Sequence, residues 1–431
     1  MPFFIILILL LLTYLAFSNL GELYVFYQLI DNGFILFAVI LIIVFTFLII
    51  IRYLLLMFFS IFKVGLKTER ETKDKTLHTH HKVSIIVPAY NEEVVIGRSI
   101  VSLLQQTYPN MEVIVVDDGS KDQTYLYAKR YESNRIKVIT KPNGGKSRAI
   151  NTGIEYATGD LVMVVDADSR LNDDAVALMV QYFDDPSIAA VAGSVYVVNQ
   201  INIVTRLQAL EYIEGLNMVR NGQAFLKLVN IIPGPIGMFR IDALKKVGLY
   251  DHDTFAEDCD VTLKLLAEGY SIDFESDAVA YTEAPEELLD LIKQRYRWTR
   301  GILQAIRKHR GYLFRTQGRP TMTFVLWYML FESVFWPFMD VFVSLFLLYI
   351  TLITGINSLL FFWWSLFTVL DVAGALYCVL ITKEKLSLVF YAILYRLYFI
   401  GIINLAKVFA TVEEWLGVGM TWGKLDRKGR I

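Results

Sequence analysis

Cysteine and charged residues are both scarce in this chain of 431 residues, and each scarcity excludes a class of protein. The two cysteines, Cys259 and Cys378, lie far apart, which excludes a disulfide-stapled secreted fold and a multi-cysteine zinc or iron–sulfur site. Charged residues make up 19% of the chain and apolar residues 55%. That composition excludes an intrinsically disordered protein and argues against an ordinary soluble enzyme. The net charge of −2 gives no indication of a nucleic-acid partner.

Long apolar segments near both ends of the chain predict membrane-spanning helices, each of which needs roughly 20 mostly apolar residues. The candidates are residues 3–17, 34–51, 324–353, 359–381 and 388–410. The first is slightly short and could instead be a signal peptide, but it lacks a basic start and a small-residue cleavage site. The region between the two groups has the composition of a soluble domain.

We therefore expect six consecutive parts. They are N-terminal transmembrane helices (1–62), a polar linker (63–81), a soluble domain (82–287), amphipathic helices lying on the membrane surface (288–319), C-terminal transmembrane helices (320–411) and a polar tail (412–431).

Basic residues flank the soluble domain on both sides and predict its orientation. They are Lys63, Lys67, Arg70, Lys73, Lys75 and Lys82 before it, and Lys293, Arg295, Arg297, Arg300, Arg307, Lys308, Arg310, Arg315 and Arg319 near its end. Because positive residues stay on the cytoplasmic side, we expect a multi-pass cell-membrane protein with the soluble domain and the N-terminus in the cytoplasm. Three C-terminal spans would place the tail outside, whereas its basic residues favour the cytoplasm, so the number of spans stays open.

Two acidic residues interrupt the segment 324–353. An ionised side chain at the centre of the bilayer costs about 2.5–3.5 kcal/mol on insertion scales. Glu332 and Asp340 are therefore expected to face a protein interior or to belong to an interfacial segment, and Pro337 should break the helix.

The soluble region alternates short apolar runs with helical patterns. The runs are 83–87, 113–116, 136–139 and 161–165, and the helical patterns are 94–106, 122–131 and 146–157. This alternation predicts an α/β domain with a mostly parallel sheet, in which ligands bind at the carboxyl ends of the strands. Polar residues follow every run and should converge at that edge.

Two of these polar groups indicate chemistry. Asp166 and Asp168 directly follow a predicted strand, and two carboxylates in one small space repel unless a cation separates them. Hard oxygen ligands suit Mg²⁺ or Mn²⁺, which also bind diphosphates. Gly144 and Gly145 precede Lys146 without the spacing of a P-loop, but a turn at a helix start can still direct the lysine at phosphate oxygens.

Five short motifs in this order resemble those of the family 2 glycosyltransferases, and in particular the membrane-embedded processive polysaccharide synthases with a GT-A-like domain. They are VPAYNEE at 87–93, DDGS at 117–120, DAD at 166–168, ED at 257–258 and QRYRW at 294–298. The resemblance covers residues 83–298 and the flanking helices. It is greatest to the bacterial poly-N-acetylglucosamine synthases, followed by the hyaluronan and chitin-type synthases.

The resemblance implies a donor site for a UDP-sugar. Tyr90 and Glu92 would line the uridine pocket, and Asp117 would accept a hydrogen bond from uracil. Lys146 would contact the diphosphate. Asp166 and Asp168 would hold the donor and the metal, with Asp168 as the direct metal ligand.

The resemblance also implies the catalytic and acceptor residues. Asp258, beside Glu257, matches the general base of a Thr-Glu-Asp motif, in which Ala256 replaces the threonine here. That replacement leaves the base in place but puts any threonine contact in doubt. The remaining matches form the acceptor and diphosphate clamp: Gln294, Arg297 and Trp298. Trp298 would offer a flat apolar face to a sugar ring, although a membrane-anchoring role is the alternative.

The predicted function is a processive, inverting glycosyltransferase that polymerises a β-linked polysaccharide and passes it through its own helices. The expected partners are a UDP-sugar donor, the growing polysaccharide, the lipid bilayer and, as an open question, a small accessory membrane subunit. The alternatives are a hyaluronan or chitin-type synthase, a non-processive enzyme that transfers one sugar to a lipid phosphate, and an inactive membrane scaffold or transporter.

Three other features have less specific interpretations. His78, His80 and His81 resemble a metal cluster, but their charge-rich surroundings favour a solvated linker. Cys259 is interpreted as a packing residue rather than a nucleophile. The PGPIG turn at residues 233–237 resembles the loop lining the acceptor pocket of the synthases, with an ordinary surface turn as the alternative.

Overall fold

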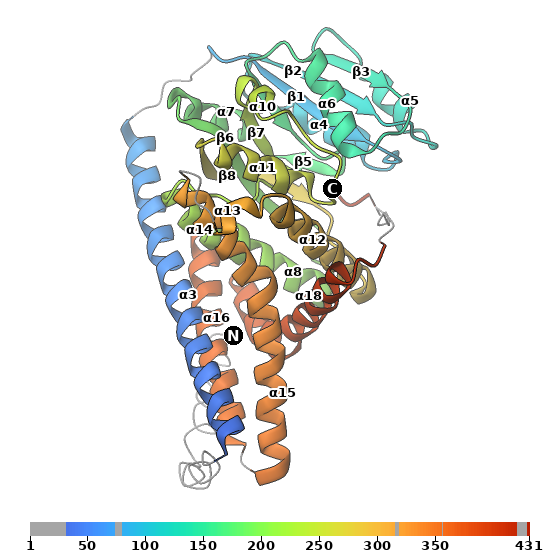
Figure 1. The fold of residues 1–431 in the computed structure, drawn as a ribbon. Coiled ribbons are helices and arrows are strands. Elements are labelled where there is room, and N and C mark those ends of the chain that lie inside the picture. Colours follow the sequence, from blue (N-terminus) through green and yellow to red (C-terminus); the bar gives the residue numbers. More distant parts are fainter. Residues whose placement is uncertain (1–31, 74–79, 315–318, 356, 420–428) are drawn as a thin grey trace.

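A sheet domain lies at one end of a group of long helices in this computed structural model (Figure 1). The structure describes the chain except for residues 1–31, 74–79, 315–318, 356 and 420–428. The apolar segment 3–17 therefore lies outside the described residues.

The sheet has eight strands in the order β3-β2-β1-β4-β7-β6-β8-β5. The strands are β1 (Val83–Ala89), β2 (Met111–Asp117), β3 (Ile136–Thr140), β4 (Leu161–Val164), β5 (Ser169–Leu171), β6 (Ile188–Val197), β7 (Gly237–Arg240) and β8 (Ser271–Thr282). The first four are parallel, as is the pair β6 and β8. Strand β7 runs antiparallel to both of its neighbours, and β5 runs antiparallel to β8. The predicted α/β class with a mostly parallel sheet is confirmed.

Helices cover both faces of the sheet because successive strand residues point in opposite directions. Ile85 packs with Ile96 on one face, whereas Ile86 packs with Ile150 on the other. The first face carries α4 (Ile96–Leu104) and α7 (Ala175–Val180), and the second carries α6 (Lys146–Tyr156), α10 (Ile241–Lys246) and α11 (Glu257–Ala267). The short helix α5 (Thr124–Lys129) lies between β2 and β3, and the 3-10 turn η1 (Gln181–Asp184) precedes β6.

A helical layer lies between the sheet and the long helices (Figure 1). It contains α8 (Ile203–Ile213), the π-helical turn η2 (Glu214–Met218), α9 (Val219–Phe225), α12 (Leu288–Lys308) and α13 (Gly311–Phe314). Helix α12 covers the segment in which the sequence predicts an amphipathic helix. Helix α12 packs against α11 and against α18 (Ile400–Trp415), the last of the described helices.

Three described helices are long and apolar enough to cross a membrane. Two of them are α3 (Gly33–Lys73) and α16 (Ser358–Thr382). The third runs through α14 (Pro320–Leu330), the π-helical turn η3 (Phe331–Phe335) and α15 (Trp336–Thr354). Pro337 is expected to break this helix, but the helix continues past it, because the π-helical turn directly before Pro337 shifts the hydrogen bonding and accommodates its missing N–H.

The span predicted at 388–410 is a bent pair of helices. Residues Leu386–Leu397 and Ile400–Trp415 meet at 52°. The first part combines the 3-10 turn η4 (Leu386–Phe390), α17 (Tyr391–Leu394) and the π-helical turn η5 (Tyr395–Phe399), and the second is α18. Helix α18 continues to Trp415, so residues 412–415, assigned to the polar tail, are helical.

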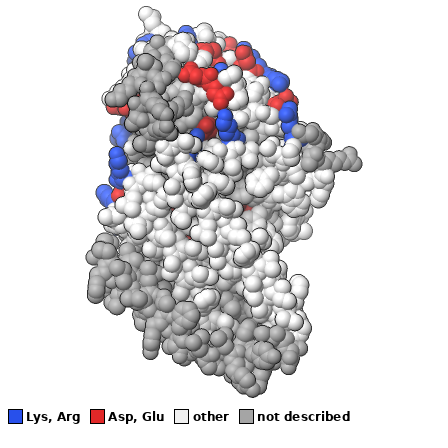
Figure 2. All heavy atoms as spheres, turned by 90° about the vertical axis from the view of Figure 1, so that its left-hand side faces the viewer, with Lys and Arg blue, Asp and Glu red and all other residues white. Residues whose placement is uncertain are grey.

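The polar residues of the helical part face one another. Arg396 forms an ion pair with Asp371 at 2.7 Å, and Asn404 donates a hydrogen bond to Asp340 at 2.9 Å. Glu332 pairs with Arg52. The expectation that the acids of residues 324–353 face a protein interior agrees with these contacts. On the face shown in Figure 2, charge gathers on the sheet domain and the described surface of the helices is almost free of it.

Candidate active site

A cavity of about 390 Å³ lies where β4 ends and faces α12. Most of the residues to which the sequence assigns a role line it, although they come from four separate segments. They are Lys146, Asp166, Asp168, Glu257, Asp258, Gln294, Arg297 and Trp298. The PGPIG turn reaches the same cavity because β7 is antiparallel to β4, which places the start of β7 beside the carboxyl end of β4.

An ion cluster forms the floor of the cavity. Lys146, the first residue of α6, places Nζ 2.6 Å from Asp166 and 3.0 Å from Glu257. Burial alone would lower the pKa of Lys146, but Asp166 and Glu257 raise it well above its usual range, so the lysine is charged. Burial raises the pKa of Asp166, and the charges of Asp168 and Glu257 act in the same direction. The cluster therefore holds more negative charge than one lysine neutralises.

Asp258 lies in the first turn of α11 and combines burial with a nearby negative charge. Its Oδ1 accepts the backbone N–H of Cys259 at 2.7 Å. Burial, followed by the charge of Glu257, raises the pKa of Asp258 to about 6. A carboxylate with this pKa is ionised at neutral pH and accepts a proton more readily than an ordinary aspartate. Ala256 stands at the N-cap without any side-chain hydrogen bond, as the missing threonine implied.

The charge balance of the cavity suits a divalent cation. Its lining contains six acidic side chains and four basic ones, a surplus of two negative charges when all are ionised. Asp166 and Asp168 supply the hard oxygen atoms that Mg²⁺ and Mn²⁺ prefer. Gly234 closes the turn over the ion cluster, since a Cβ there would lie 2.8 Å from Lys146 Nζ and 2.9 Å from Asp166 Oδ2. A side chain at this position would therefore displace the ends of Lys146 and Asp166 from their present positions.

An aromatic platform on α12 faces the cavity opening. The ring of Trp298 is 38% exposed and lies 6.4 Å from the ring of Tyr212. The guanidinium of Arg295 lies 4.3 Å from the Trp298 ring and forms an ion pair with Glu211 at 2.7 Å. Gln294 accepts a hydrogen bond from Arg295 at 3.0 Å. Arg295 therefore fixes two residues of the predicted acceptor clamp.

Three predicted donor-site residues do not line this cavity. Tyr90 and Glu92 follow β1, and Asp117 is the last residue of β2. All three lie at the same edge of the sheet as the cavity, but outside its lining. The carboxylate of Asp117 is buried and accepts hydrogen bonds from Thr140 Oγ1 at 2.8 Å and from the Ser120 N–H at 3.3 Å. Their predicted roles at a uridine pocket stay predictions.

Two residues of the site have roles that the motifs did not reveal. Asp118 accepts the N–H groups of Gly144 and Gly145 and pairs with Lys141 at 2.6 Å, so it holds the turn that positions Lys146. Arg220, on α9, lines the cavity, and its buried side chain donates to Asn230 at 3.2 Å. Burial lowers the pKa of Arg220 to about 10, and the negative charge of Asp258 opposes this effect. No motif or spacing in the sequence identifies Arg220, because its place at the cavity depends on the packing of α9.

Comparison with known proteins shows which enzymes this chain resembles. Residues 84–248 match the family described as Glycosyl transferase family 2. The poly-beta-1,6-N-acetyl-D-glucosamine synthase of Staphylococcus aureus strain COL is 32% identical over 255 residues, which cover 58% of this chain and 61% of that protein. The synthase of Staphylococcus epidermidis is 33% identical over 224 residues, 51% of this chain and 54% of that protein. The match thus spans about three fifths of the relatives' length or less.

A solved structure shares the fold at low sequence identity. The mannosyltransferase PcManGT from Pyrobaculum calidifontis, in complex with GDP-Man and Mn²⁺, superposes with a TM-score of 0.58 at 18% identity. The superposition covers 85% of this chain and 100% of the mannosyltransferase. At this identity the likeness establishes the fold, and the function must be argued from the site.

Proposed function

We propose that this chain, a family 2 glycosyltransferase by the domain at residues 84–248, polymerises N-acetylglucosamine from a UDP-linked donor and moves the β-linked product through its helices. One observation carries the proposal: the acidic residues that suit a cation and the aromatic ring of Trp298 line the same cavity. The staphylococcal synthases, named for a poly-N-acetylglucosamine product, support the choice of sugar. The mannosyltransferase with the same fold binds Mn²⁺, which supports a divalent metal here.

The residues of the cavity divide the reaction between them. Asp258 accepts the proton of the acceptor hydroxyl, while the new bond forms at the sugar carbon and the bond to the diphosphate breaks. Lys146 and Arg297 stabilise the negative charge that develops on the leaving diphosphate. Asp166 and Asp168 would hold Mg²⁺ or Mn²⁺, which supplies further positive charge to the diphosphate when bound. Attack opposite the leaving group inverts the sugar carbon and makes a β-linkage.

The platform around Trp298 accounts for a polymeric product. A flat apolar ring binds a sugar without fixing one hydroxyl orientation, so the acceptor end can advance by one residue after each transfer. The three membrane-length helices beside the cavity would provide the route across a bilayer, with the sheet domain in the cytoplasm.

A donor panel tests the proposed function. The full chain, purified in nanodiscs with Mg²⁺ or Mn²⁺, is given labelled UDP-sugars singly and in pairs, and the products are sized. We expect high-mass polymer from UDP-N-acetylglucosamine alone. A requirement for UDP-glucuronate would replace the proposal with a hyaluronan synthase, and a short lipid-soluble product would replace it with a single-transfer enzyme. The absence of product from every donor would contradict catalysis by the chain alone.

Replacing Trp298 with alanine should shorten the polymer and leave UDP affinity unchanged, because the ring packs near Tyr212 and Arg295 on the helical side of the cavity. Product size and UDP binding by calorimetry measure the two effects. Trp415→Ala is the matched control, since this tryptophan is 66% exposed and stacks on Phe338 outside the cavity. An equal effect of both variants on polymer length would mean that Trp298 is only a membrane anchor, and a loss of UDP affinity would assign it to the donor site.

A further inference from the structure

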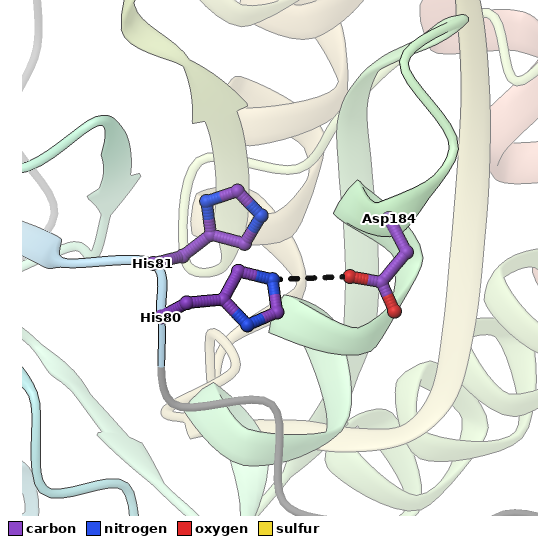
Figure 3. A group of neighbouring side chains, drawn as sticks. All are labelled: His80, His81 and Asp184. Atoms are coloured by element: carbon purple, nitrogen blue, oxygen red, sulfur yellow. Dashed lines mark ion pairs between the residues drawn. The ribbon is translucent and has the colours of Figure 1, made fainter.

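Two histidines at the start of the sheet domain face a carboxylate from another part of the chain (Figure 3). His80 and His81 precede β1, and Asp184 ends η1, just before β6. One ring nitrogen of each histidine and one carboxylate oxygen of Asp184 all lie within 4.8 Å of one another. Figure 3 shows each ring turning one nitrogen toward Asp184. The sequence favoured a solvated linker here, because it gave no sign of a carboxylate that is about a hundred residues away.

A second carboxylate fixes the orientation of one of these rings. Nδ1 of His81 is hydrogen-bonded to Oδ2 of Asp160, the residue before β4. Since an ionised carboxylate can only accept, the proton of a neutral His81 lies on Nδ1 and its Nε2 keeps a lone pair. Histidines that bind metals commonly have such a carboxylate on their other nitrogen. Oδ1 of Asp160 also accepts the backbone N–H of Lys82 at 2.7 Å, so the carboxylate is itself held in place.

The distance between two of the ligand atoms suits a tetrahedral ion. Nε2 of His80 lies 3.4 Å from Oδ1 of Asp184. Two ligands at about 2.0–2.1 Å from a tetrahedral zinc ion stand about 3.3 Å apart. The centroids of the His80 and His81 rings are 4.6 Å apart, so two imidazole ligands lie beside each other and near the same carboxylate.

We propose that His80, His81 and Asp184 form a binding site for a zinc-class transition metal ion, with Asp160 as the positioning residue of His81. Two imidazoles and one carboxylate suit Zn²⁺, Ni²⁺ or Cu²⁺ and not the hard ions Mg²⁺ and Ca²⁺. The ion would join the linker that follows α3 to the turn η1.

This site is separate from the candidate active site. His81 and Asp160 stand at the amino ends of β1 and β4, which pair in parallel, whereas Asp166 and Asp168 lie beyond the carboxyl end of β4. Helix α3 reaches the same corner of the domain, since Lys63 pairs with Asp273 and its Nζ lies 5.5 Å from the ring of Tyr182 in η1. The ion would therefore add a metal link to a junction between the long helix and the sheet.

A second cluster of three possible ligands in the described chain, Asp251, Asp253 and Asp260, differs from the group at His80 in its charge. Lys308 Nζ lies within 2.6–2.9 Å of all three carboxylates, and His309 binds Asp260 at 2.9 Å. A lysine already supplies the positive charge there. In contrast, the group at His80 combines two nitrogen ligands with one carboxylate.

Metal binding by the full chain tests the proposal without any transferase assay. The protein is purified in nanodiscs without a histidine tag, and millimolar Mg²⁺ and UDP are added to fill the carboxylate site. Zn²⁺ affinity is measured by competition with a chromophoric chelator, and the absorption bands of Co²⁺ report tetrahedral geometry. We expect one Zn²⁺ per chain and a tetrahedral Co²⁺ spectrum.

Matched variants separate this site from adventitious binding. His80→Ala combined with His81→Ala should weaken Zn²⁺ binding at least about 100-fold, and Asp160→Asn about 10-fold, as expected for an outer carboxylate. His252→Ala, which removes an exposed histidine elsewhere, should bind Zn²⁺ like the unmodified chain. Unfolding curves recorded without metal check that the double variant is folded. Equal Zn²⁺ affinity in the double variant, or no retention of Zn²⁺ by the unmodified chain, would overturn the proposal.

Discussion

Asp258→Asn should reduce the turnover of sugar transfer by about 10²–10⁴-fold, the usual contribution of a positioned general base. Asparagine keeps the size of the side chain and the oxygen that accepts the Cys259 N–H at 2.7 Å, so the first turn of α11 should remain intact. UDP affinity should change little because Lys146 and its partners stay in place. Turnover measured with the donor of the panel, together with UDP calorimetry, separates the two effects.

The pH dependence of the reaction provides a second check on Asp258. Its raised pKa of about 6 means that the side chain becomes protonated as the pH falls through this value. Because only the ionised form accepts a proton, kcat/KM should fall about ten-fold per pH unit below about pH 6 and stay level above it. Asp253→Asn, an exposed neighbour bound to Lys308 at 2.9 Å, is the control and should keep the full rate. Near-normal turnover of Asp258→Asn would remove the residue from the base role.

Asp168→Asn should abolish the stimulation of donor binding by Mn²⁺ and lower kcat/KM at least about 100-fold, which corresponds to about 2.7 kcal/mol of transition-state stabilisation. The reason is that Asp168 is expected to be a direct ligand of the metal. Asparagine has the size of aspartate and keeps an oxygen that can accept the hydrogen bond from Ser169 Oγ, which is 3.2 Å long, so the substitution should leave the fold intact. UDP binding with and without Mn²⁺ is the measurement.

The control for this prediction lies a few residues further along the chain. Asp173→Asn removes one negative charge from an exposed position that the cavity does not include, and it should preserve the response to Mn²⁺. If Asp168→Asn bound UDP in a fully Mn²⁺-dependent way, Asp166 and its neighbours would have to hold the metal without it.

Local patterns in the sequence were sufficient to predict the first strands and helices of the sheet domain. Buried parallel strands read as continuous apolar runs, so β1 to β4 and the helices α4 to α6 lie where the sequence predicts them. The acidic and basic residues that follow these strands could be expected to meet at one edge, and Lys146 and Asp166 do form an ion pair there. The membrane-length helices followed from hydropathy alone.

Contacts between distant segments could not be predicted in the same way. Strand β7 has four residues, and its antiparallel insertion, which brings Gly234 to the ion cluster, depends on pairing with β4 and β6. The bend before α18 and the stacking of Arg295 on Trp298 are likewise set by packing against other helices. The motif of the acceptor clamp includes Arg297 but not Arg295, so the sequence did not predict that Arg295 positions Trp298 and Gln294.

Helix α3 is much longer than a bilayer is thick. Its 41 residues extend about 60 Å, at 1.5 Å per residue, whereas the hydrocarbon core measures about 30 Å. One end is fixed to the sheet domain through Lys63 and Asp273. Where α3 crosses a bilayer, a tilt that matches a thinner or thicker membrane would move the sheet domain with the helix. The length of the lipid acyl chains would then set the height and the angle of the candidate cavity above the membrane.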